Sequence, residues 1–383
     1  MTSIPVHPIA RPDFSDDDLF YIKQCLESYW ATQGPLVSSF EEKIKERHQA
    51  SYALATTSCT AALHLSTMAL DLSPGDEVIV PAFTWITSAH CVEYVGAKVV
   101  FADIDPFTFN LCPKSLEKAI TPRTKAVVVV HLFGLSAPMD DILAITHPRG
   151  IKIIEDAACA IGTTYKGRPV GAIGDLGCFS FHPRKVITTG EGGMVLTHQK
   201  TLATKIAALR NHGATGLPPE DPKAERPYTM SHFEVLGYNL RLCDIQAGLG
   251  LSQFKKLDRI LEHRKKCALY YTEKLKDTAE LILPTDPCGG HTYQSYVIRL
   301  ASGEKKKRNA LMDFLKEKGI QTRPGTHAVH RLGYYAKKYH IEPDAFPYAS
   351  LCEDTTITLP IYPSMTERDQ DAIVKTMRDG IGL

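Results

Sequence analysis

The sequence predicts an α/β protein with a mostly parallel sheet in a large domain, residues 1–255, and a smaller C-terminal α+β domain, residues 256–383. First, strand-like and helix-like stretches alternate over the first two hundred residues, the pattern of a parallel sheet with helices on both faces. Second, strand candidates such as 126–130 are apolar throughout, as in strands that are buried on both faces. Third, a long helical stretch, 257–276, precedes a region with few strand candidates, so we expect the domains to meet there.

Each element is predicted from its local pattern. Ser15 followed by three aspartates marks a helix start, and apolar runs bounded by Gly and polar residues are typical of buried strands. Residues 216–227, rich in Pro and charge, are expected to form a surface loop. The expected strands are 52–55, 77–80, 98–102, 126–130, 151–154, 178–181, 193–196, 294–300 and 356–359. The expected helices are 16–29, 37–48, 59–70, 86–95, 113–120, 201–211, 244–257, 257–276, 305–318 and 366–378.

Composition excludes several classes of protein. A net charge of +1 over 383 residues argues against broad attraction to nucleic acid or to an anionic membrane. No run approaches the roughly 20 apolar residues that a membrane span needs, and residues 1–18 lack the pattern of a signal peptide. The 10 cysteines form no C-x-x-C pair, so we expect reduced thiols in a cytoplasmic protein and no metal site. His327 and His330 lie close in sequence but have no apparent third ligand.

An acid and a lysine each follow a predicted strand. Asp156 comes after the run 151–154, and Lys185 comes after 178–181. The carboxyl ends of parallel strands meet at one edge of the sheet, where ligands bind. Pyridoxal phosphate needs a lysine amine for a Schiff base and a carboxylate against its ring nitrogen. Either residue alone would be a strand-end cap or a solvated charge, but the pair indicates a pyridoxal phosphate site.

Two further features fit this cofactor, and each has a simpler alternative. Thr57 and Ser58 lie between a strand and a helix, where exposed amides attract a phosphate; a plain N-cap would use the same residues. Trp85 lies just beyond the strand 77–80 and could stack on a flat ring; simple core packing would also explain it. The sequence leaves both choices open.

The motifs in their order resemble one family, the DegT/DnrJ/StrS sugar aminotransferases. The resemblance extends from residues 30–35 to the C-terminal part and is carried by the motifs at 155–158, 179–185, 189–193 and 237–241. It implies the aspartate aminotransferase type of pyridoxal phosphate fold. It also implies a homodimer that moves an amino group from glutamate to a keto group of a nucleotide-linked sugar, such as a 4-keto-6-deoxy sugar.

The resemblance assigns roles to individual residues. Lys185 would hold the cofactor covalently, Asp156 would pair with its ring nitrogen, and Trp85 would stack on the ring. The phosphate would be held by Thr57, Ser58, Ser180 and the partner subunit's Asn239. Relatives with His in place of the lysine are sugar dehydratases, so Lys185 favours transamination.

Position 159 departs from the family pattern. Relatives commonly have Gln or His there, contacting the ring hydroxyl, whereas this chain has Cys159. A thiol is a weak donor and acceptor, so we expect that contact to be weakened, lost or supplied by another group.

Candidate substrate ligands are cationic. Arg184 and Arg241 could meet the carboxylates of glutamate, and the segment 321–335 resembles the one that faces the sugar nucleotide in the family. Within that segment Arg323, His327 and His330 could bind a diphosphate, or they could be ordinary solvated or packed residues. We further expect burial and neighbouring cations to favour the neutral amine of Lys185, which proton transfer requires.

Other functions remain open at this level. A pyridoxal phosphate dehydratase or deoxygenase would use the same fold, and a non-catalytic regulatory homologue would keep it without turnover. The nucleotide base, the sugar, and the position and stereochemistry of amination are likewise open.

Overall fold

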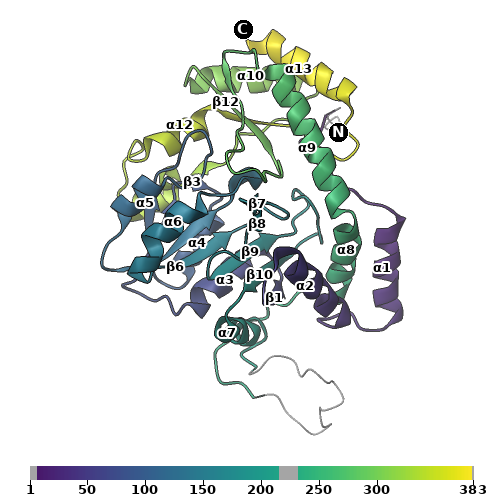
Figure 1. Ribbon diagram of the computed structural model, residues 1–383, viewed down its shortest axis with the longest axis vertical. Helices are drawn as coiled ribbons and strands as arrows, with labels where there is room; N and C mark the ends of the chain where they lie inside the picture. Colours follow the sequence, from purple (N-terminus) through teal and green to yellow (C-terminus); the bar gives the residue numbers. More distant parts are fainter. Residues whose placement is uncertain (1–6, 215–231, 382–383) are drawn as a thin grey trace.

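The computed structural model describes residues 7–214 and 232–381, and Figure 1 shows their arrangement. Within these residues the largest sheet has seven strands in the order β1-β10-β9-β6-β5-β2-β4. Strands β4, β2, β5, β6 and β9 pair in parallel, while β10 runs antiparallel to both of its neighbours. The bounds are β1 (Tyr52–Thr56), β2 (Glu77–Pro81), β4 (Lys98–Ala102), β5 (Thr124–Val130), β6 (Lys152–Asp156), β9 (Leu176–Ser180) and β10 (Gly193–Thr197). The predicted α/β class with a mostly parallel sheet is confirmed.

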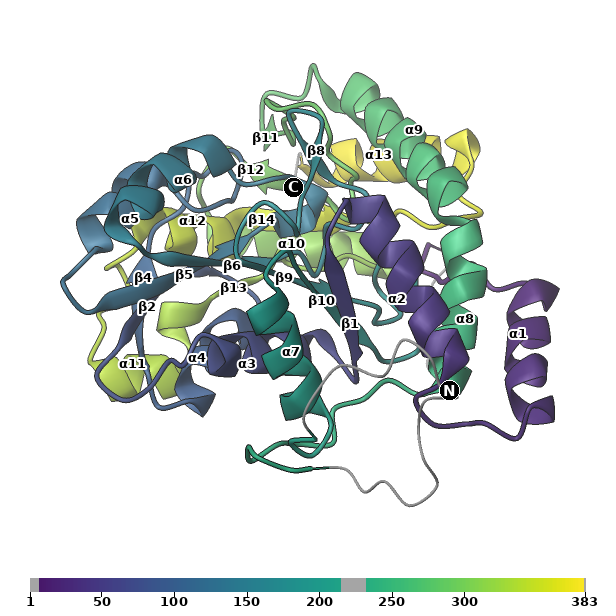
Figure 2. The same ribbon diagram turned by 60° about the horizontal axis from the view of Figure 1, so that its bottom comes forward.

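Both faces of the large sheet are covered by helices. Successive strand residues point to opposite faces: Val78 and Val80 enter one hydrophobic core, and Ile79 between them enters another. Figure 2 shows the two helical layers above and below the strands. The first core includes α3 (Cys59–Ala69), α4 (Thr87–Tyr94) and α7 (Lys200–Arg210). The second includes α2 (Pro35–His48), α5 (Pro113–Ala119), α6 (Met139–Thr146) and α8 (Asp244–Lys255).

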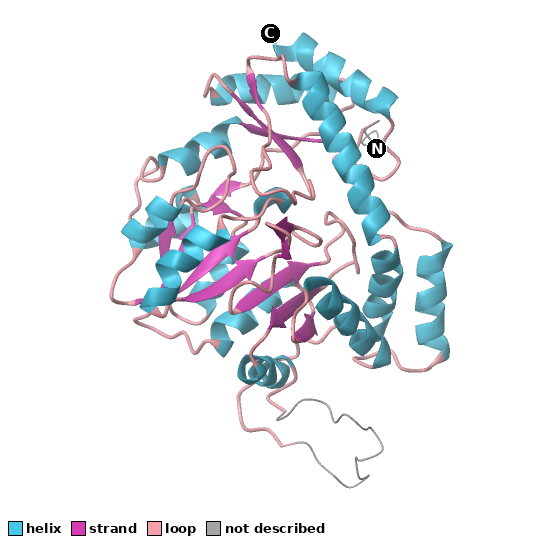
Figure 3. Cartoon of the chain, viewed as in Figure 1, coloured by secondary structure: helices cyan, strands magenta, loops and turns pink. Residues whose placement is uncertain are grey.

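The C-terminal part has its own sheet and core. Figure 3 shows this small sheet apart from the large one. Its strands are β11 (Leu281–Ile282), β12 (Tyr296–Leu300) and β14 (Thr356–Leu359), in the order β11-β12-β14. They pack with α9 (Leu257–Leu275), α10 (Lys305–Glu317) and α13 (Glu367–Ile381) around a third core. The expected domain boundary falls where α8 ends and α9 begins; the division into domains stays a prediction.

Two contacts link distant segments of the chain. Strand β13 (His327–Ala328) pairs antiparallel with β3 (Phe83–Thr84), which follows β2. Helix α1 (Asp16–Glu27) packs along α8 (Figure 1), where the carboxylate of Asp18 accepts a hydrogen bond from Lys256 at 2.8 Å. The first contact brings the C-terminal part to the carboxyl edge of the large sheet.

The predicted elements differ from the structure mainly at their ends. The strand expected at 294–300 begins at Tyr296, and the helix expected to reach residue 257 ends at Lys255. Several short elements were not predicted from sequence. They include β3, β11 and β13, and also β7 (Thr164–Tyr165), β8 (Arg168–Pro169), α11 (Gly333–Tyr339) and α12 (Pro347–Thr355). The expected loop at 216–227 lies outside the described residues. Among the described helices, none has the length and hydropathy that crossing a bilayer requires.

Candidate active site

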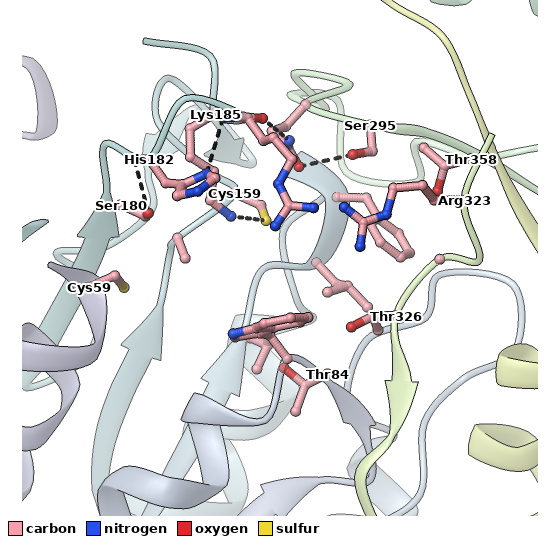
Figure 4. A pocket seen from close by; sticks show the side chains of 18 of the residues that line it. Cys59, Thr84, Cys159, Ser180, His182, Lys185, Ser295, Arg323, Thr326 and Thr358 are labelled. Atoms are coloured by element: carbon pink, nitrogen blue, oxygen red, sulfur yellow. Dashed lines mark hydrogen bonds between the residues drawn. The ribbon is translucent and has the colours of Figure 1, made fainter. Parts of the chain in front are cut away.

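A cavity of about 390 Å³ lies at the carboxyl edge of the parallel strands. The ends of β5, β6 and β9 contribute Val130, Asp156 and Ser180 to its wall. Figure 4 shows side chains from these strand ends and from the C-terminal part around the same space. The candidate residues that line it are Ser58, Trp85, Asp156, Cys159, Ser180, Arg184, Lys185, Arg323 and His327. Residues that are distant in sequence thus form one site.

Asp156 is the last residue of β6 and is held from two sides. Its side chain is 4% exposed. The hydroxyl of Ser88, on α4, donates to Oδ2 at 2.6 Å, and the backbone amide of Ala158 donates to Oδ1 at 3.2 Å. Two such donors, on different oxygens, fix the rotamer of the carboxylate. The carboxylate is therefore oriented for a cationic partner in the cavity.

Lys185 lies in the hairpin that joins β9 to β10. Its backbone amide donates to the carbonyl of His182 at 2.8 Å, closing a turn just after β9. Further along, the amide of Thr189 donates to the carbonyl of Phe181, and the amide of Phe181 donates to the carbonyl of Gly192, both at 2.9 Å. The glycine at 190 has φ +80°, a backbone conformation that glycine adopts without strain. The hairpin thus returns the chain to β10 while directing Lys185 into the cavity.

The amine of Lys185 has a thiol as its neighbour. Nζ donates to Sγ of Cys159 at 3.1 Å, as Figure 4 shows. Burial disfavours the ammonium, but Cys159, with Cys59 and Asp156, outweighs that effect and raises the pKa of Lys185. The expectation that neighbouring cations favour the neutral amine is therefore wrong, because the groups around Nζ are thiols and a carboxylate.

The N-terminus of α3 can serve as a cradle for an anion. The side chain of Ser58 caps the helix by accepting the amide of Ala61 at 3.1 Å. Cys59 and Thr60, which begin the helix, line the cavity, and amides at this position lack intrahelical partners. A Cβ on Gly193 would lie 2.5 Å from the backbone of Ser58, so glycine allows β10 to approach the cradle this closely.

Three predicted site residues lie near the cradle but do not line the cavity in this chain. Thr57 uses its amide to bind the carbonyl of Leu240 at 3.0 Å. Asn239 is exposed and pairs through its backbone with Asn211, and the guanidinium of Arg241 donates to the Asn211 side chain. The structure therefore brings residues 239–241 against the start of the cradle, with Asn239 facing outward.

The C-terminal segment brings two of its three candidates to the cavity. Arg323 is exposed, and its backbone pairs with Thr358 beside the opening. His327 packs against Trp85 with ring centroids 5.6 Å apart, and Trp85 itself is 48% exposed. The prediction for His330 is not supported: the side chain is fully buried, with Nε2 hydrogen-bonded to the carbonyl of Pro343 at 3.0 Å. It packs within the protein and does not reach the cavity.

Sequence reasoning missed several residues of the site. The cavity wall also includes Ile9, Ala10, His182, Glu191, Gln294 and Ser295. His182 lies inside a motif that the sequence singled out, so it could have been found. Residues 9–10 and 294–295 carry no local signal, because only the packing of the N-terminal segment and of the C-terminal part brings them to the sheet edge. Among the described residues no group of three or more His, Cys, Asp or Glu is arranged to hold a metal.

These residues fit pyridoxal phosphate. A lysine amine, a doubly hydrogen-bonded carboxylate and a helix N-terminus line one cavity, and these groups suit the aldehyde, the ring nitrogen and the phosphate of that cofactor. Trp85 offers an aromatic face in the same space.

Comparison with known proteins agrees with the fold. The chain is 36% identical over 382 residues to the GDP-perosamine synthase of Caulobacter vibrioides, covering 98% of this chain and 99% of that protein. It is 38% identical to the spore coat polysaccharide biosynthesis protein SpsC of Bacillus subtilis, covering 97% and 96%. Among solved structures, the putative sugar aminotransferase Spr1654 of Streptococcus pneumoniae in its PMP form superposes with a TM-score of 0.92 at 27% identity. That match covers 98% of this chain and 99% of that one.

The fold and these likenesses define the class of protein as an aminotransferase with the pyridoxal phosphate type of fold. The chain belongs to the DegT/DnrJ/EryC1/StrS aminotransferase family, whose model matches residues 12–378. Aminotransferases of this family use pyridoxal phosphate. The family, fold, enzyme class and cofactor expected from sequence are thereby confirmed.

Proposed function

We propose that this aminotransferase moves an amino group from glutamate to a keto group of a nucleotide-linked sugar. The observation that carries the proposal is the placement of Lys185 and Asp156 on the wall of one cavity at the carboxyl edge of the sheet. The choice of a sugar acceptor is supported by the relatives, one named for GDP-perosamine synthesis and one for spore coat polysaccharide biosynthesis.

In this proposal each residue around the cofactor has a separate role. When bound, pyridoxal phosphate takes up the electrons left when a proton leaves the substrate and carries the amino group between the two substrates. Lys185 binds the cofactor and moves that proton with its amine. Asp156, held by Ser88 and Ala158, pairs with the ring nitrogen. Trp85 covers the ring face and limits the access of water.

The phosphate is assigned to the α3 cradle. Ser58 caps that helix, and Ser180 lies at the end of the neighbouring β9 with its hydroxyl on the cavity wall. Thr57 precedes the cap. In the proposed homodimer the partner subunit's Asn239 completes the set of phosphate ligands, which agrees with the outward position of Asn239 in this chain.

We place the reaction in the cytoplasm.

The substrates are assigned to the cations at the cavity opening. Arg184 and Arg323 are both exposed and line the cavity, and guanidinium groups suit carboxylates and phosphates. We assign Arg184 to glutamate and Arg323 to the sugar nucleotide, with His327 beside Arg323. Arg241 is a weaker candidate, because in this chain its guanidinium is engaged by Asn211.

The test separates cofactor attachment from turnover. Borohydride reduction of the holoenzyme followed by mass mapping should place the label on Lys185. Lys185→Ala should lose the label and turnover, whereas Lys152→Ala should keep both, because Lys152 is an exposed residue that pairs with Asp175. Wild-type turnover by Lys185→Ala would refute the proposal.

The two substrates can be tested in separate half-reactions. Glutamate alone should convert the bound cofactor to its amino form, which a dehydratase or a non-catalytic homologue need not do. A panel of keto-sugar nucleotides should then restore the starting absorbance. Arg323→Ala should raise the KM for the sugar nucleotide about tenfold, the loss of one charged hydrogen bond, and leave the glutamate half-reaction unchanged. An unchanged KM removes Arg323 from the site.

A further inference from the structure

Asp156 accepts a hydrogen bond from Ser88, a residue that lies outside all of the sequence motifs described above. Ser88 lies on α4, one turn after Trp85, and is fully buried. Its hydroxyl donates to Oδ2 of Asp156 at 2.6 Å, the shorter of the two hydrogen bonds to this carboxylate. A separation of 2.6 Å is typical of a charge-assisted bond between a hydroxyl and an ionised carboxylate.

A second hydroxyl lies behind Ser88. Oγ1 of Thr84 is 2.9 Å from Oγ of Ser88. A hydroxyl has one proton, and Ser88 gives its proton to Asp156, so Thr84 must be the donor in this contact. The three side chains therefore form one directed chain of hydrogen bonds, from Thr84 to Ser88 to Asp156.

Thr84, where this series of hydrogen bonds begins, is held in place by the C-terminal part of the protein. Thr84 belongs to β3, which pairs with His327 in β13. The amide of Val329 also donates to the carbonyl of Ala82 at 2.7 Å. Thr84 is 1% exposed and lies on the wall of the cavity (Figure 4). A segment some 240 residues away thus holds the strand from which the hydroxyl chain begins.

We propose that Ser88, backed by Thr84, is a positioning residue that sets the orientation of Asp156 toward the ring nitrogen of the cofactor. Ser88 does not line the cavity, so it acts through Asp156. The inference rests on the proposed role of Asp156 and goes beyond it by assigning the group that holds the carboxylate. Because Ser88 and the amide of Ala158 hold the two oxygens of the carboxylate, its rotamer is fixed before a cofactor binds.

The test compares three variants of the full-length chain. Ser88→Ala should weaken cofactor binding about tenfold and slow the glutamate half-reaction by a similar factor at saturating cofactor, as expected for loss of one hydrogen bond to a charge. It should also alter the pH dependence of the absorbance of the bound cofactor. Ser88→Thr keeps the hydroxyl and should remain within about threefold of wild type. Ser66→Ala is the matched control, since Ser66 is a fully buried helix serine that bonds Ala62 and Cys178.

The outcomes decide between the possibilities. Cofactor affinity and half-reaction rate within twofold of wild type in Ser88→Ala would overturn the inference, as would equal losses in Ser66→Ala or in Ser88→Thr. If Ser88→Ala does not fold, Thr84→Val, nearly equal in shape and lacking the hydroxyl, should weaken cofactor binding about threefold; no change would count against the inference. Asp156→Ala separates the two levels. Normal cofactor binding and a normal half-reaction in this variant would refute the proposed role of Asp156, and the inference about Ser88 with it. Losses in Asp156→Ala beside wild-type behaviour of Ser88→Ala would overturn the inference about Ser88 alone.

Discussion

Replacing Glu155 by Gln should destabilise the protein more than its conservative shape suggests. Glu155 precedes Asp156 in β6 and is fully buried. Oε1 accepts the amides of Ile173 and Gly174 at 2.7 and 2.6 Å. Oε2 accepts the amide of Gly171 at 2.7 Å and Nε2 of His131 at 2.8 Å. All four partners are donors, since Nδ1 of His131 accepts the amide of Ala137 and leaves the proton on Nε2.

The magnitude follows from the number of donors. A glutamine amide has one oxygen and one NH₂ group, so it can satisfy two of the four donors and must point its own NH₂ group at the other two. Each lost hydrogen bond to a charge costs about 1.5 to 3 kcal/mol, which gives a loss of about 4 kcal/mol. With about 2.1 cal/mol/K of unfolding entropy per residue over 383 residues, this lowers Tm by about 5 °C.

A second buried carboxylate gives the control. Glu77 is 1% exposed, but its partners Arg123 and Lys98 are more than half exposed and Thr121 contributes a rotatable hydroxyl. In Glu77→Gln the two cations can turn to water and the Thr121 hydroxyl can reverse its role, so the loss should be smaller than in Glu155→Gln. Differential scanning calorimetry of both variants measures the contrast. Equal shifts in Tm, or a shift under 1 °C for Glu155→Gln, would refute the reasoning.

The pH dependence has a definite sign. Burial disfavours the Glu155 carboxylate, but the His131 contact and the amides outweigh it and hold the pKa below the ordinary 4.5. A carboxyl group whose pKa is lowered by folding stabilises the protein above the unfolded value and loses that contribution as pH falls. The stability difference between wild type and Glu155→Gln should therefore be constant near neutral pH and narrow below about pH 4.5.

Two further changes test the site, and a third tests the contact between α1 and α8. Burial lowers the pKa of Lys185 while Cys159 raises it. In Cys159→Ala, which has no acceptor at this position, the acylation of Lys185 in cofactor-free protein should therefore follow a pH profile shifted to lower pH; an unchanged profile contradicts this contact. Gly193→Ala places a Cβ 2.5 Å from the backbone of Ser58. The resulting strain of roughly 1.4 kcal/mol should weaken the binding of phosphate and cofactor at least about tenfold. Normal binding in isothermal titration calorimetry contradicts this prediction. Asp18→Asn breaks a buried pair with Lys256 and should lower stability by about 3 kcal/mol in urea unfolding, with cofactor affinity unchanged.

Much of the fold was predictable because its signals are local. Apolar runs and their polar boundaries located the strands of the large sheet to within two residues, and the predicted strand 98–102 matches β4 at both ends. Elements without a strong apolar pattern were missed, such as the two-residue strands β7 and β8. Such short strands exist only because another segment supplies their hydrogen bonds, so their own residues do not predict them.

The candidate site was predictable to a similar depth. Asp156 and Lys185 each follow a strand, and parallel strands end at one edge, so their approach followed from topology alone. The distance between Lys185 and Cys159 did not, because it depends on how the turn after β6 and the hairpin after β9 pack together. The choice left open for His330, a diphosphate ligand or a packed residue, also needed the tertiary structure, because the sequence does not indicate which way this helical turn faces.

The sequence by itself determined the class of fold, the order of its strands along the chain and the pair of residues suited to the cofactor, since each is recorded in a few neighbouring residues. Only the tertiary structure decided that β10 runs antiparallel, that β13 pairs with β3, and that Ser88 and Thr84 stand behind Asp156. These features depend on side-chain packing between segments up to 240 residues apart, where backbone periodicity carries no information.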